Sequence, residues 1–462
     1  MEPRSIAYLA AACGGLLLRG NADAIARGIS TDSRTCRAGE VFVALVGERF
    51  DGHAYVDQVA RVGVAAVMVE RDPGPAAAGC AVILVANTRL ALGRLAARYR
   101  LDFAVPVVVV GGSNGKTTTK DILAYILKEK YNTLSSEASF NNDIGVPLTL
   151  LKLTSHHQAV VLEIGTNHPG ELAPLMRLSQ PRYGIMTSLG REHLAFFGDL
   201  DGVVAEEGWL AELLPAEGKL FVNGDLPLME SLIQRSRAAA IRVGMNADNV
   251  WRGQLIRLDE NGMVFKVQAP RAACAGEYEV ARLGRHQLTN VLLALAVGAE
   301  LGLNREELQR GLRASRPAKM RLQLWEQAGI KVLDDSYNAN ADSMQAALQT
   351  LRDLPCAGRR IAVLGDMAEL GAAADEAHAE VGQAAAALGI ERLFAVGQMA
   401  PIMAAAARRA GLDAVDDYRE VEAASQAVKA FVRPGDLVLL KASRATHIER
   451  IGEALRQQLD GA

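Results

Sequence analysis

Residues 107–119, with the sequence VVVVGGSNGKTTT, decide the fold of this 462-residue chain. Four consecutive valines are typical of a parallel strand that is buried on both faces. The glycines that follow let backbone N–H groups close around phosphate oxygens, and the amino end of the next helix adds positive potential. The loop has the shorter G-x-x-G-K-T form, because Val110 stands where the longer form has its first glycine. The alternative is a glycine-rich turn with a chance lysine.

This stretch predicts a nucleotide-binding P-loop between a strand and a helix that opens at Lys120. We expect Lys116 to reach the β- and γ-phosphates and the Thr117 hydroxyl to bind Mg²⁺. The residues expected to hold the phosphates are Gly112, Ser113, Asn114, Gly115, Lys116, Thr117 and Thr118. A P-loop serves motors, switches, kinases and ligases alike, so it does not identify a reaction.

Short apolar runs alternate with helical patterns on both sides of the P-loop, which predicts an α/β fold. The predicted strands are 41–45, 65–69, 107–110, 159–162, 185–186, 220–222, 331–333, 361–364, 393–396 and 437–440. Helices with an apolar or alanine-rich pattern are predicted at 120–130 and 400–410. We expect three domains, namely a small N-terminal α/β domain (1–104), a central doubly wound P-loop domain (105–316) and a C-terminal Rossmann-like α/β domain (317–462).

The composition is that of a globular protein without a strong charge excess. The 50 basic and 53 acidic residues give a net charge of −3, so the cationic excess of a typical nucleic-acid binder is missing. Five scattered cysteines without a C-x-x-C pair argue against structural zinc and favour a reducing compartment. The uncharged segment 5–18 resembles a signal peptide, but Glu2, Gly14 and Arg19 favour a helix of the first domain. No stretch is long enough to span a membrane, so we expect a cytoplasmic location.

Two chemically active side chains follow the next predicted strands. Glu163 ends the 159–162 run, and His193 follows the 185–186 run. The carboxyl ends of neighbouring parallel strands meet at one crevice, where a nucleotide-bound Mg²⁺ needs oxygen ligands. We expect Glu163 to bind this ion, and His193 either to bind a second Mg²⁺ or to orient a phosphate. The alternatives are a surface acid and an ordinary hydrogen-bonded loop histidine.

Several motifs in order along the chain resemble the Mur ligase family of ATP-dependent amide ligases, which build peptidoglycan precursors. Residues 30–34 and 51–53 are similar to the family's uridine-nucleotide-binding segment, and residues 284–290 to the stretch beside the adenine. The resemblance implies a uridine-nucleotide site made of Thr31, Asp32, Ser33, Arg34, Gly47, Asp51, Gly52 and His53. It implies Asn290, Arg321 and Asp335 as further ATP contacts at the adenine, γ-phosphate and ribose, and Asn141, Asn142, Asn167 and His168 as peptide-substrate contacts.

Three blocks are similar to the family member that joins D-alanyl-D-alanine to UDP-N-acetylmuramoyl tripeptide. They are residues 167–171 (NHPGE), 334–340 (DDSYNAN) and 365–371 (GDMAELG), whereas the Asp-Asn-Pro-Arg motif of the diaminopimelate-adding member does not occur. The resemblance implies that the tripeptide carboxylate attacks the γ-phosphate of ATP, and that the dipeptide amine then displaces phosphate from the acyl phosphate.

The same resemblance implies the roles of domains and residues. The first domain would bind the UDP substrate, and the third would close over ATP, bind the dipeptide acceptor and exclude water. The implied catalytic residues are Lys116, Glu163, His193 and Arg321. We expect a monomer that uses ATP and Mg²⁺.

One position departs from the family pattern. Family members usually carry a carbamylated lysine, a ligand of the second Mg²⁺, fourteen residues after the counterpart of His193. Here that position is Glu207, and no lysine occurs between Lys152 and Lys219. We expect the Glu207 carboxylate to replace the carbamate, which completes a metal set of Thr117, Glu163, His193 and Glu207. The alternative is a solvated helical acid and a second metal that is lost or held differently.

Two other functions are left open by the sequence. A nucleotide-dependent switch or scaffold needs no uridine-nucleotide segment, so residues 31–34 and 51–53 argue against it. A sister ligase that adds diaminopimelate, lysine or polyglutamate is disfavoured only by the resemblance of the blocks at 337–340 and 365–371. The sequence specifies neither the third residue of the tripeptide nor the residues that bind D-alanyl-D-alanine.

Overall fold

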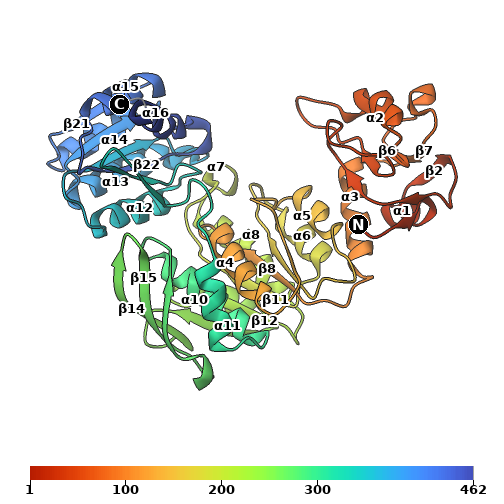
Figure 1. Ribbon diagram of the computed structural model, residues 1–462, viewed down its shortest axis with the longest axis horizontal. Coiled ribbons are helices and arrows are strands. Elements are labelled where there is room, and N and C mark those ends of the chain that lie inside the picture. Colours follow the sequence, from red (N-terminus) through yellow and green to blue (C-terminus); the bar gives the residue numbers. More distant parts are fainter. Residues whose placement is uncertain (461–462) are drawn as a thin grey trace.

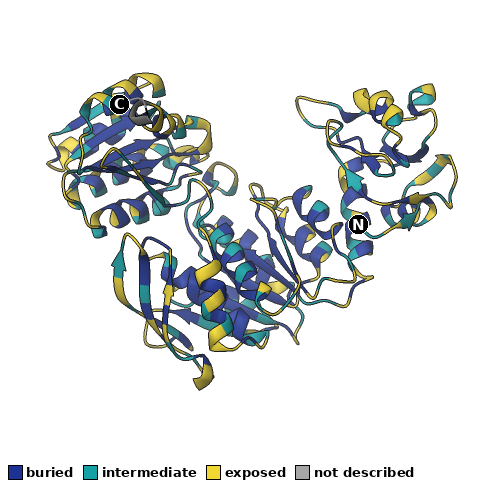
Figure 2. Ribbon diagram, viewed as in Figure 1, coloured by how far each residue is buried: buried dark blue, intermediate teal, exposed yellow. Residues whose placement is uncertain are grey.

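The computed structural model describes residues 1–460. Three α/β units follow one another along the chain, with the first and third at opposite ends and both beside the middle unit (Figure 1). The strands are mostly buried, and the helices around them expose one face (Figure 2). Within residues 1–460, no helix is long and apolar enough to cross a membrane.

The first unit is built on a five-stranded sheet with the order β2-β7-β6-β5-β4. Its elements are α1 (Ile6–Cys13), β2 (Leu16–Arg19), β4 (Ile29–Ser30), β5 (Val41–Val43), α2 (Val56–Val62), β6 (Ala66–Val69), β7 (Ala81–Leu84) and α3 (Thr88–Arg100), with a separate pair of β1 (Arg4–Ser5) and β3 (Ile25–Ala26). The uncharged N-terminal segment forms the expected helix, which is shorter than expected because Gly14 ends it in a left-handed conformation (φ +70°). Ile6, Leu9 and Cys13 of this helix are buried in the core.

The middle unit is a nine-stranded sheet with the order β16-β15-β14-β13-β12-β11-β8-β10-β9. Its parallel strands are β8 (Val107–Gly111), β9 (Thr133–Ser135), β10 (Ala159–Glu163), β11 (Tyr183–Met186), β12 (Lys219–Asn223) and β13 (Ala239–Gly244). Its helices are α4 (Lys116–Lys128), α5 (Gly145–Leu150), α6 (Leu172–Ser179), α7 (Leu194–Phe197), α8 (Leu200–Glu212), α9 (Met229–Arg235), α10 (Gln287–Glu300) and α11 (Arg305–Ala314). Val107 and Val109 face one core and Val108 and Val110 the other, so the valine run is covered on both faces as predicted.

Several features of this unit differ from the expectation, and the parallel strands β9 and β13 were not predicted. Helix α4 begins at Lys116 rather than Lys120, because the chain enters the helix directly from Gly115 in a left-handed conformation. An antiparallel extension of β14 (Trp251–Asp259), β15 (Gly262–Gln268) and β16 (Gly276–Val280) was not predicted. Its sequence mixes polar and apolar residues, because one face of the extension is exposed.

The third unit is a six-stranded sheet with the order β17-β18-β22-β19-β20-β21. Its strands are β17 (Gln323–Gln327), β18 (Ile330–Asp334), β19 (Arg360–Gly365), β20 (Arg392–Val396), β21 (Val415–Tyr418) and β22 (Leu437–Lys441). Its helices are α12 (Ala341–Asp353), α13 (Ala374–Ala387), α14 (Ala400–Arg409), α15 (Val421–Phe431) and α16 (Glu449–Asp460). Separate apolar cores lie on the two faces of the sheet, which is the doubly wound arrangement.

The strand order places the carboxyl ends of three central strands side by side. Strand β8 pairs with β10 on one side and with β11 on the other. The loops that follow these three strands therefore open at one edge of the sheet, where an α/β fold binds its ligands. The third unit docks against this same edge (Figure 1).

Candidate active site

The P-loop is held by its neighbours on the central sheet. The amide N–H of Gly112 donates to Glu207 Oε2 (3.0 Å), and the amides of Ser113 and Asn114 donate to the backbone oxygen (2.9 Å) and hydroxyl (2.8 Å) of Ser188. These three amides were expected to face phosphate, but here they bond within the protein. The remaining amides at the start of α4 have no intrahelical acceptor, so they are the N–H groups available to phosphate oxygens.

Two glycines of the loop have no room for a side chain. Gly112 has φ +111°, and a Cβ atom there would lie 2.6 Å from Ser188 O. Gly115 has φ +87°, and its Cβ would lie 2.5 Å from Oδ1 of Asn290, one of the predicted adenine contacts. The close approach of Gly115 to Asn290 brings the P-loop beside the start of α10, in agreement with a single nucleotide site.

Lys116 lies at the centre of a group of carboxylates. Its Nζ donates to Gly112 O and to Ser113 O (3.3 Å), and lies 3.5 Å from Glu192 Oε2. Burial alone would lower the pKa of Lys116, but the carboxylates of Glu192, Glu207 and Glu163 outweigh it and raise that pKa. Lys116 is therefore a firmly charged ammonium beside the loop, as phosphate binding requires.

Glu163 and Glu207 each present a buried carboxylate oxygen without a protein partner. Glu163 Oε1 accepts a hydrogen bond from Asn141 Nδ2 (2.9 Å), and Glu207 Oε2 accepts from Gly112, whereas Glu163 Oε2 and Glu207 Oε1 have no hydrogen bond. Both residues are 1% exposed. Desolvation raises the pKa of Glu207 to about 7, with Lys116 opposing the rise and Glu192 adding to it.

These two orphan oxygens fit a hard divalent cation. Mg²⁺ binds carboxylate and hydroxyl oxygens and usually keeps phosphate oxygens and waters as its other ligands. Thr117, the third predicted oxygen ligand, is buried at the first turn of α4. Among residues 1–460, no three acidic, histidine or cysteine side chains are gathered into a ready-made metal cluster. The donor set thus suits an ion that arrives with the nucleotide.

His193 lies apart from the two orphan carboxylates. Its Nδ1 contacts Glu369 Oε2 of the third unit, and its Nε2 is 4.0 Å from Glu192 Oε2. His193 precedes α7 in a left-handed conformation (φ +49°). Its predicted role as a metal ligand or phosphate-orienting group stays a prediction.

Arg321, another predicted ATP contact, lines a crevice between the middle and third units, and Asp335 bonds to Leu322 of its lining. The guanidinium of Arg321 lies 4.2 Å from the ring centre of Tyr337. Asp335 accepts from the Leu322 amide (3.1 Å) and forms an ion pair with Lys441. This narrow crevice is lined by Thr118, Asp121, Arg282, Leu283, Gln287, Pro317, Ala318, Arg321 and Leu322.

Three residues of the site were not anticipated. Glu192 is buried beside Lys116, Lys441 is buried against Asp335, and Glu369 meets His193. The position of Lys441 directly after a predicted strand was an available signal, since polar residues at strand ends face the crevice. Glu192 carries no comparable local signal, and Glu369 stood out only as part of the block 365–371, to which no role was assigned.

The predicted uridine-nucleotide residues occupy two loops of the first unit. Residues 31–34 follow β4 and residues 47–53 follow β5, its parallel neighbour, and Arg34 forms a two-pronged ion pair with Asp32 (2.9 and 2.7 Å). His53 differs from the expectation. Its Nδ1 bonds to Asp51 (2.6 Å) and its Nε2 accepts from the Glu70 amide (2.9 Å), so both ring nitrogens support the loop and neither is free for a ligand.

The predicted peptide-substrate residues divide in the same way. Asn141 binds Glu163 at the centre of the site. Asn142 instead accepts from the Gly145 amide (2.9 Å) at the start of α5, and the His168 ring packs on Phe196 with ring centres 4.2 Å apart. The amide of Asn167 donates to Glu171 (2.8 Å). Only Asn141 is thus placed directly beside the carboxylates.

Helix α8 ties the loop that contains Asn167 and His168 to the P-loop. The Glu206 carboxylate accepts from the amides of Gly170 (2.9 Å) and Leu172 (2.8 Å), while the adjacent Glu207 accepts from Gly112. Neighbouring residues of one helix therefore hold two loops, each by charge-assisted hydrogen bonds to backbone amides. A shift of α8 would move both loops together.

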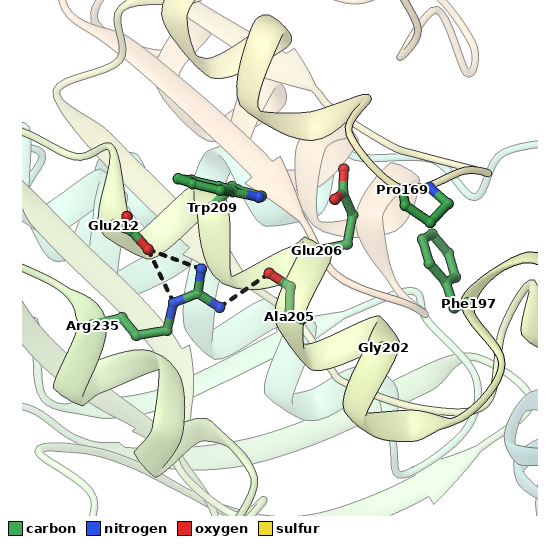
Figure 3. A pocket seen from close by; sticks show the side chains of 8 residues that line it. All are labelled: Pro169, Phe197, Gly202, Ala205, Glu206, Trp209, Glu212 and Arg235. Atoms are coloured by element: carbon green, nitrogen blue, oxygen red, sulfur yellow. Dashed lines mark hydrogen bonds and ion pairs between the residues drawn. The ribbon is translucent and has the colours of Figure 1, made fainter.

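A cavity of about 570 Å³ lies on the outer side of α8 (Figure 3). It is lined by Pro169, Phe197, Gly202, Ala205, Glu206, Trp209, Glu212 and Arg235. Arg235 is paired with Glu212 (2.9 Å) and donates to Ala205 O (3.0 Å), and Glu206 accepts from backbone amides, so each charged group of the cavity has a partner within the protein. None of the predicted site residues lines it, and we place the reaction at the P-loop instead.

Comparison with known proteins gives a consistent result along the whole chain. Residues 26–100 match the family model described as "Mur ligase family, catalytic domain", residues 110–298 match "Mur ligase middle domain", and residues 320–444 match "Mur ligase, glutamate ligase domain". The UDP-N-acetylmuramoyl-tripeptide–D-alanyl-D-alanine ligase of Bacillus subtilis is 34% identical, with 92% of each chain covered. The Escherichia coli ligase of the same name is 36% identical, with 94% of this chain and 95% of its own covered.

Solved structures agree with the sequence relatives. MurF from Acinetobacter baumannii superposes with a TM-score of 0.91 at 31% identity, covering 99% of both chains. MurF ligase from Thermotoga maritima in complex with ADP gives a TM-score of 0.84 at 26% identity, covering 94% of this chain and 98% of its own.

Proposed function

This chain belongs to the Mur ligase family, and from that premise we propose how its residues carry out the family's chemistry. The chain is an ATP-dependent, ADP-forming ligase that joins D-alanyl-D-alanine to UDP-N-acetylmuramoyl tripeptide in peptidoglycan precursor synthesis. The observation that carries this function is the match, over more than nine-tenths of the chain, to two ligases of that specificity.

We divide the chain into a UDP-substrate-binding domain (1–104), an ATP-binding domain (105–316) and a closing acceptor domain (317–462). Residue 104 lies between α3 and β8, and residue 316 between α11 and β17, so neither boundary cuts a sheet. Each proposed domain then has its own sheet, while one apolar core continues from the helices of the first domain into the middle domain.

The first step forms an acyl phosphate. A tripeptide carboxylate oxygen attacks the γ-phosphorus, the bond to the β-phosphate oxygen breaks, and ADP leaves. Both reactants are anionic, so the Lys116 ammonium has to offset their repulsion. Amides at the start of α4 hold the phosphates, and Arg321 reaches the γ-phosphate from the third domain. Asn290 and Asp335 bind the adenine and ribose.

Thr117 and Glu163 are the residues that would hold the Mg²⁺ that comes with ATP, and His193 and Glu207 would hold a second ion. When bound, the ion supplies positive charge to the transferring phosphoryl group and to the attacking carboxylate. The orphan oxygens of Glu163 and Glu207 support this assignment, because a buried carboxylate oxygen without a partner is costly unless a cation meets it.

The second step forms the amide. The dipeptide amine attacks the acyl carbon, and the tetrahedral intermediate expels inorganic phosphate. Acyl phosphates hydrolyse easily, so the third domain must exclude water while it brings the acceptor. We propose that one chain suffices for this site and acts as a monomer. The use of ATP and five free cysteines support a cytoplasmic location.

A panel of acceptors tests the proposed specificity. Phosphate release is measured with ATP, Mg²⁺, UDP-N-acetylmuramoyl tripeptide and one acceptor at a time, and the product mass is checked. We expect D-alanyl-D-alanine to raise the release at least ten-fold over buffer, with diaminopimelate, lysine and glutamate close to buffer. Stimulation by a single amino acid, with none by the dipeptide, would make the chain a sister ligase.

A further inference from the structure

The loop between β11 and α8 is held by the third unit as well as by its own, where Ser188 and Gly190 bond to the P-loop. It carries Arg191, His193 and α7, and its partners in the third unit come from residues more than 140 positions later in the chain. Three contacts join the middle unit to the third. Two of them come from this loop and one from the P-loop, and their partners lie at the start of α12, in α13 and in the loop after β19.

The first contact joins His193 to Glu369. The Nδ1 atom of His193 bonds to Glu369 Oε2, and the backbone amide of Ala195 donates to Glu369 O (2.9 Å). His193 and Glu369 both have left-handed backbones, with φ +49° and +61°, which side-chain-bearing residues rarely adopt. Two strained residues from different units therefore meet at the active-site edge, and such strain persists only where the surroundings enforce it.

The second contact fixes the same loop two residues before that histidine, and the third fixes the neighbouring P-loop. Arg191 forms a two-pronged ion pair with Glu380 (3.2 and 2.8 Å), and its amide donates to Asp342 Oδ2 (3.0 Å). At the P-loop, the side-chain amides of Asn114 and Asn340 bond to each other (3.1 Å). These bonds exist only while the third unit is docked.

We propose that Glu369 is a positioning residue, which orients the imidazole of His193 toward the active site when the third unit docks. A carboxylate that accepts the Nδ1 proton fixes both the tautomer and the ring plane, and leaves the Nε2 lone pair for a cation. Here Nε2 faces Glu192, which itself lies beside Lys116. The inference rests on the proposed function. It means that the His193 ring is oriented for its role only when the third unit is docked.

The matched variants are Glu369→Gln, which keeps the shape and removes the charge, and Glu376→Gln, an exposed acid on α13 outside the contact. A carboxylate that orients a ligating histidine is typically worth 10- to 100-fold in metal affinity or activity. We expect Glu369→Gln to lower kcat about 10- to 100-fold with little change in KM for the UDP substrate. We also expect it to weaken Mn²⁺ binding to the enzyme–ADP complex about ten-fold, measured by electron paramagnetic resonance. Glu376→Gln should match wild type in both.

The variant Glu380→Gln separates positioning from docking, because it weakens the neighbouring ion pair with Arg191 and leaves Glu369 and His193 in place. Mn²⁺ affinity close to wild type in Glu380→Gln supports positioning, whereas a loss equal to that in Glu369→Gln would reduce Glu369 to a docking contact. Glu369→Asp should recover part of the Mn²⁺ affinity. Wild-type kcat and Mn²⁺ affinity in Glu369→Gln, in an enzyme that ligates D-alanyl-D-alanine, would overturn this inference alone. Loss of ligation by the wild-type enzyme would instead overturn the proposed function.

Discussion

Replacing Lys116 by methionine should lower kcat/KM for ligation by about 10²- to 10³-fold, the usual effect of removing one charged donor from a developing anion. Lys116 is the ammonium nearest to Glu163, Glu192 and Glu207, and it has to offset the repulsion between a carboxylate and a triphosphate. Methionine keeps the length and apolar stem of lysine, so the first turn of α4 should stay packed.

The measurement is the steady-state rate of phosphate release at saturating ATP and D-alanyl-D-alanine. Lys128→Met is the matched control, because Lys128 is exposed at the far end of the same helix. The control should keep wild-type kcat/KM. A Lys116→Met enzyme that retains more than one-tenth of the wild-type value would remove Lys116 from the mechanism.

Glu207→Gln should lower kcat at least 100-fold and raise the Mg²⁺ concentration needed for half-maximal rate. Its Oε1 is one of the two orphan carboxylate oxygens, and the amide that replaces it is a much weaker ligand of a hard cation. Rates are compared across a Mg²⁺ titration with Glu212→Gln, a surface acid on the same helix that pairs with Arg235. Unchanged rate and Mg²⁺ dependence in Glu207→Gln would mean that this carboxylate holds no metal.

The same substitution should stabilise the nucleotide-free protein at alkaline pH. The buried carboxyl of Glu207 has a pKa raised to about 7 from 4.5, so the folded state holds its proton while the unfolded state releases it. Stability therefore falls as the pH rises from about 4.5 to about 7, by on the order of a few kcal/mol, and stays low above that range. Glutamine carries no such cost, so Tm of Glu207→Gln should exceed that of wild type at pH 8, with a smaller gap at pH 5. A lower Tm for the variant at pH 8 would contradict this.

Much of the fold was accessible from local sequence pattern. The valine run before Gly112 has to be covered on both faces, and the structure places it between β10 and β11 with a core on each side. The antiparallel strands β14 to β16 were missed, because they extend the sheet with one exposed face and carry no long apolar run. The predicted start of α4 was four residues too late, because the helix begins at Lys116, inside the P-loop motif and directly after Gly115.

Residues at the ends of neighbouring strands could be expected from the sequence to lie together. Contacts between residues of two different units could not. Lys116 and Glu163 each follow or end a strand of the same sheet, and the structure brings them together with Glu207. The pairing of His193 with Glu369 joins residues 176 positions apart across two units, and no local pattern reports such a contact. His53 has a binding-motif sequence, yet both of its ring nitrogens are used inside the first unit.

The most direct test of the acyl-phosphate chemistry follows one oxygen atom. Both oxygens of the terminal carboxylate of the UDP-N-acetylmuramoyl tripeptide are labelled with ¹⁸O, the ligation is run with ATP and D-alanyl-D-alanine, and the phosphate product is analysed by ³¹P NMR. Attack of that carboxylate on the γ-phosphorus, followed by expulsion of phosphate by the amine, predicts one ¹⁸O atom in each phosphate released. Phosphate without ¹⁸O, formed alongside the pentapeptide, would contradict the mechanism.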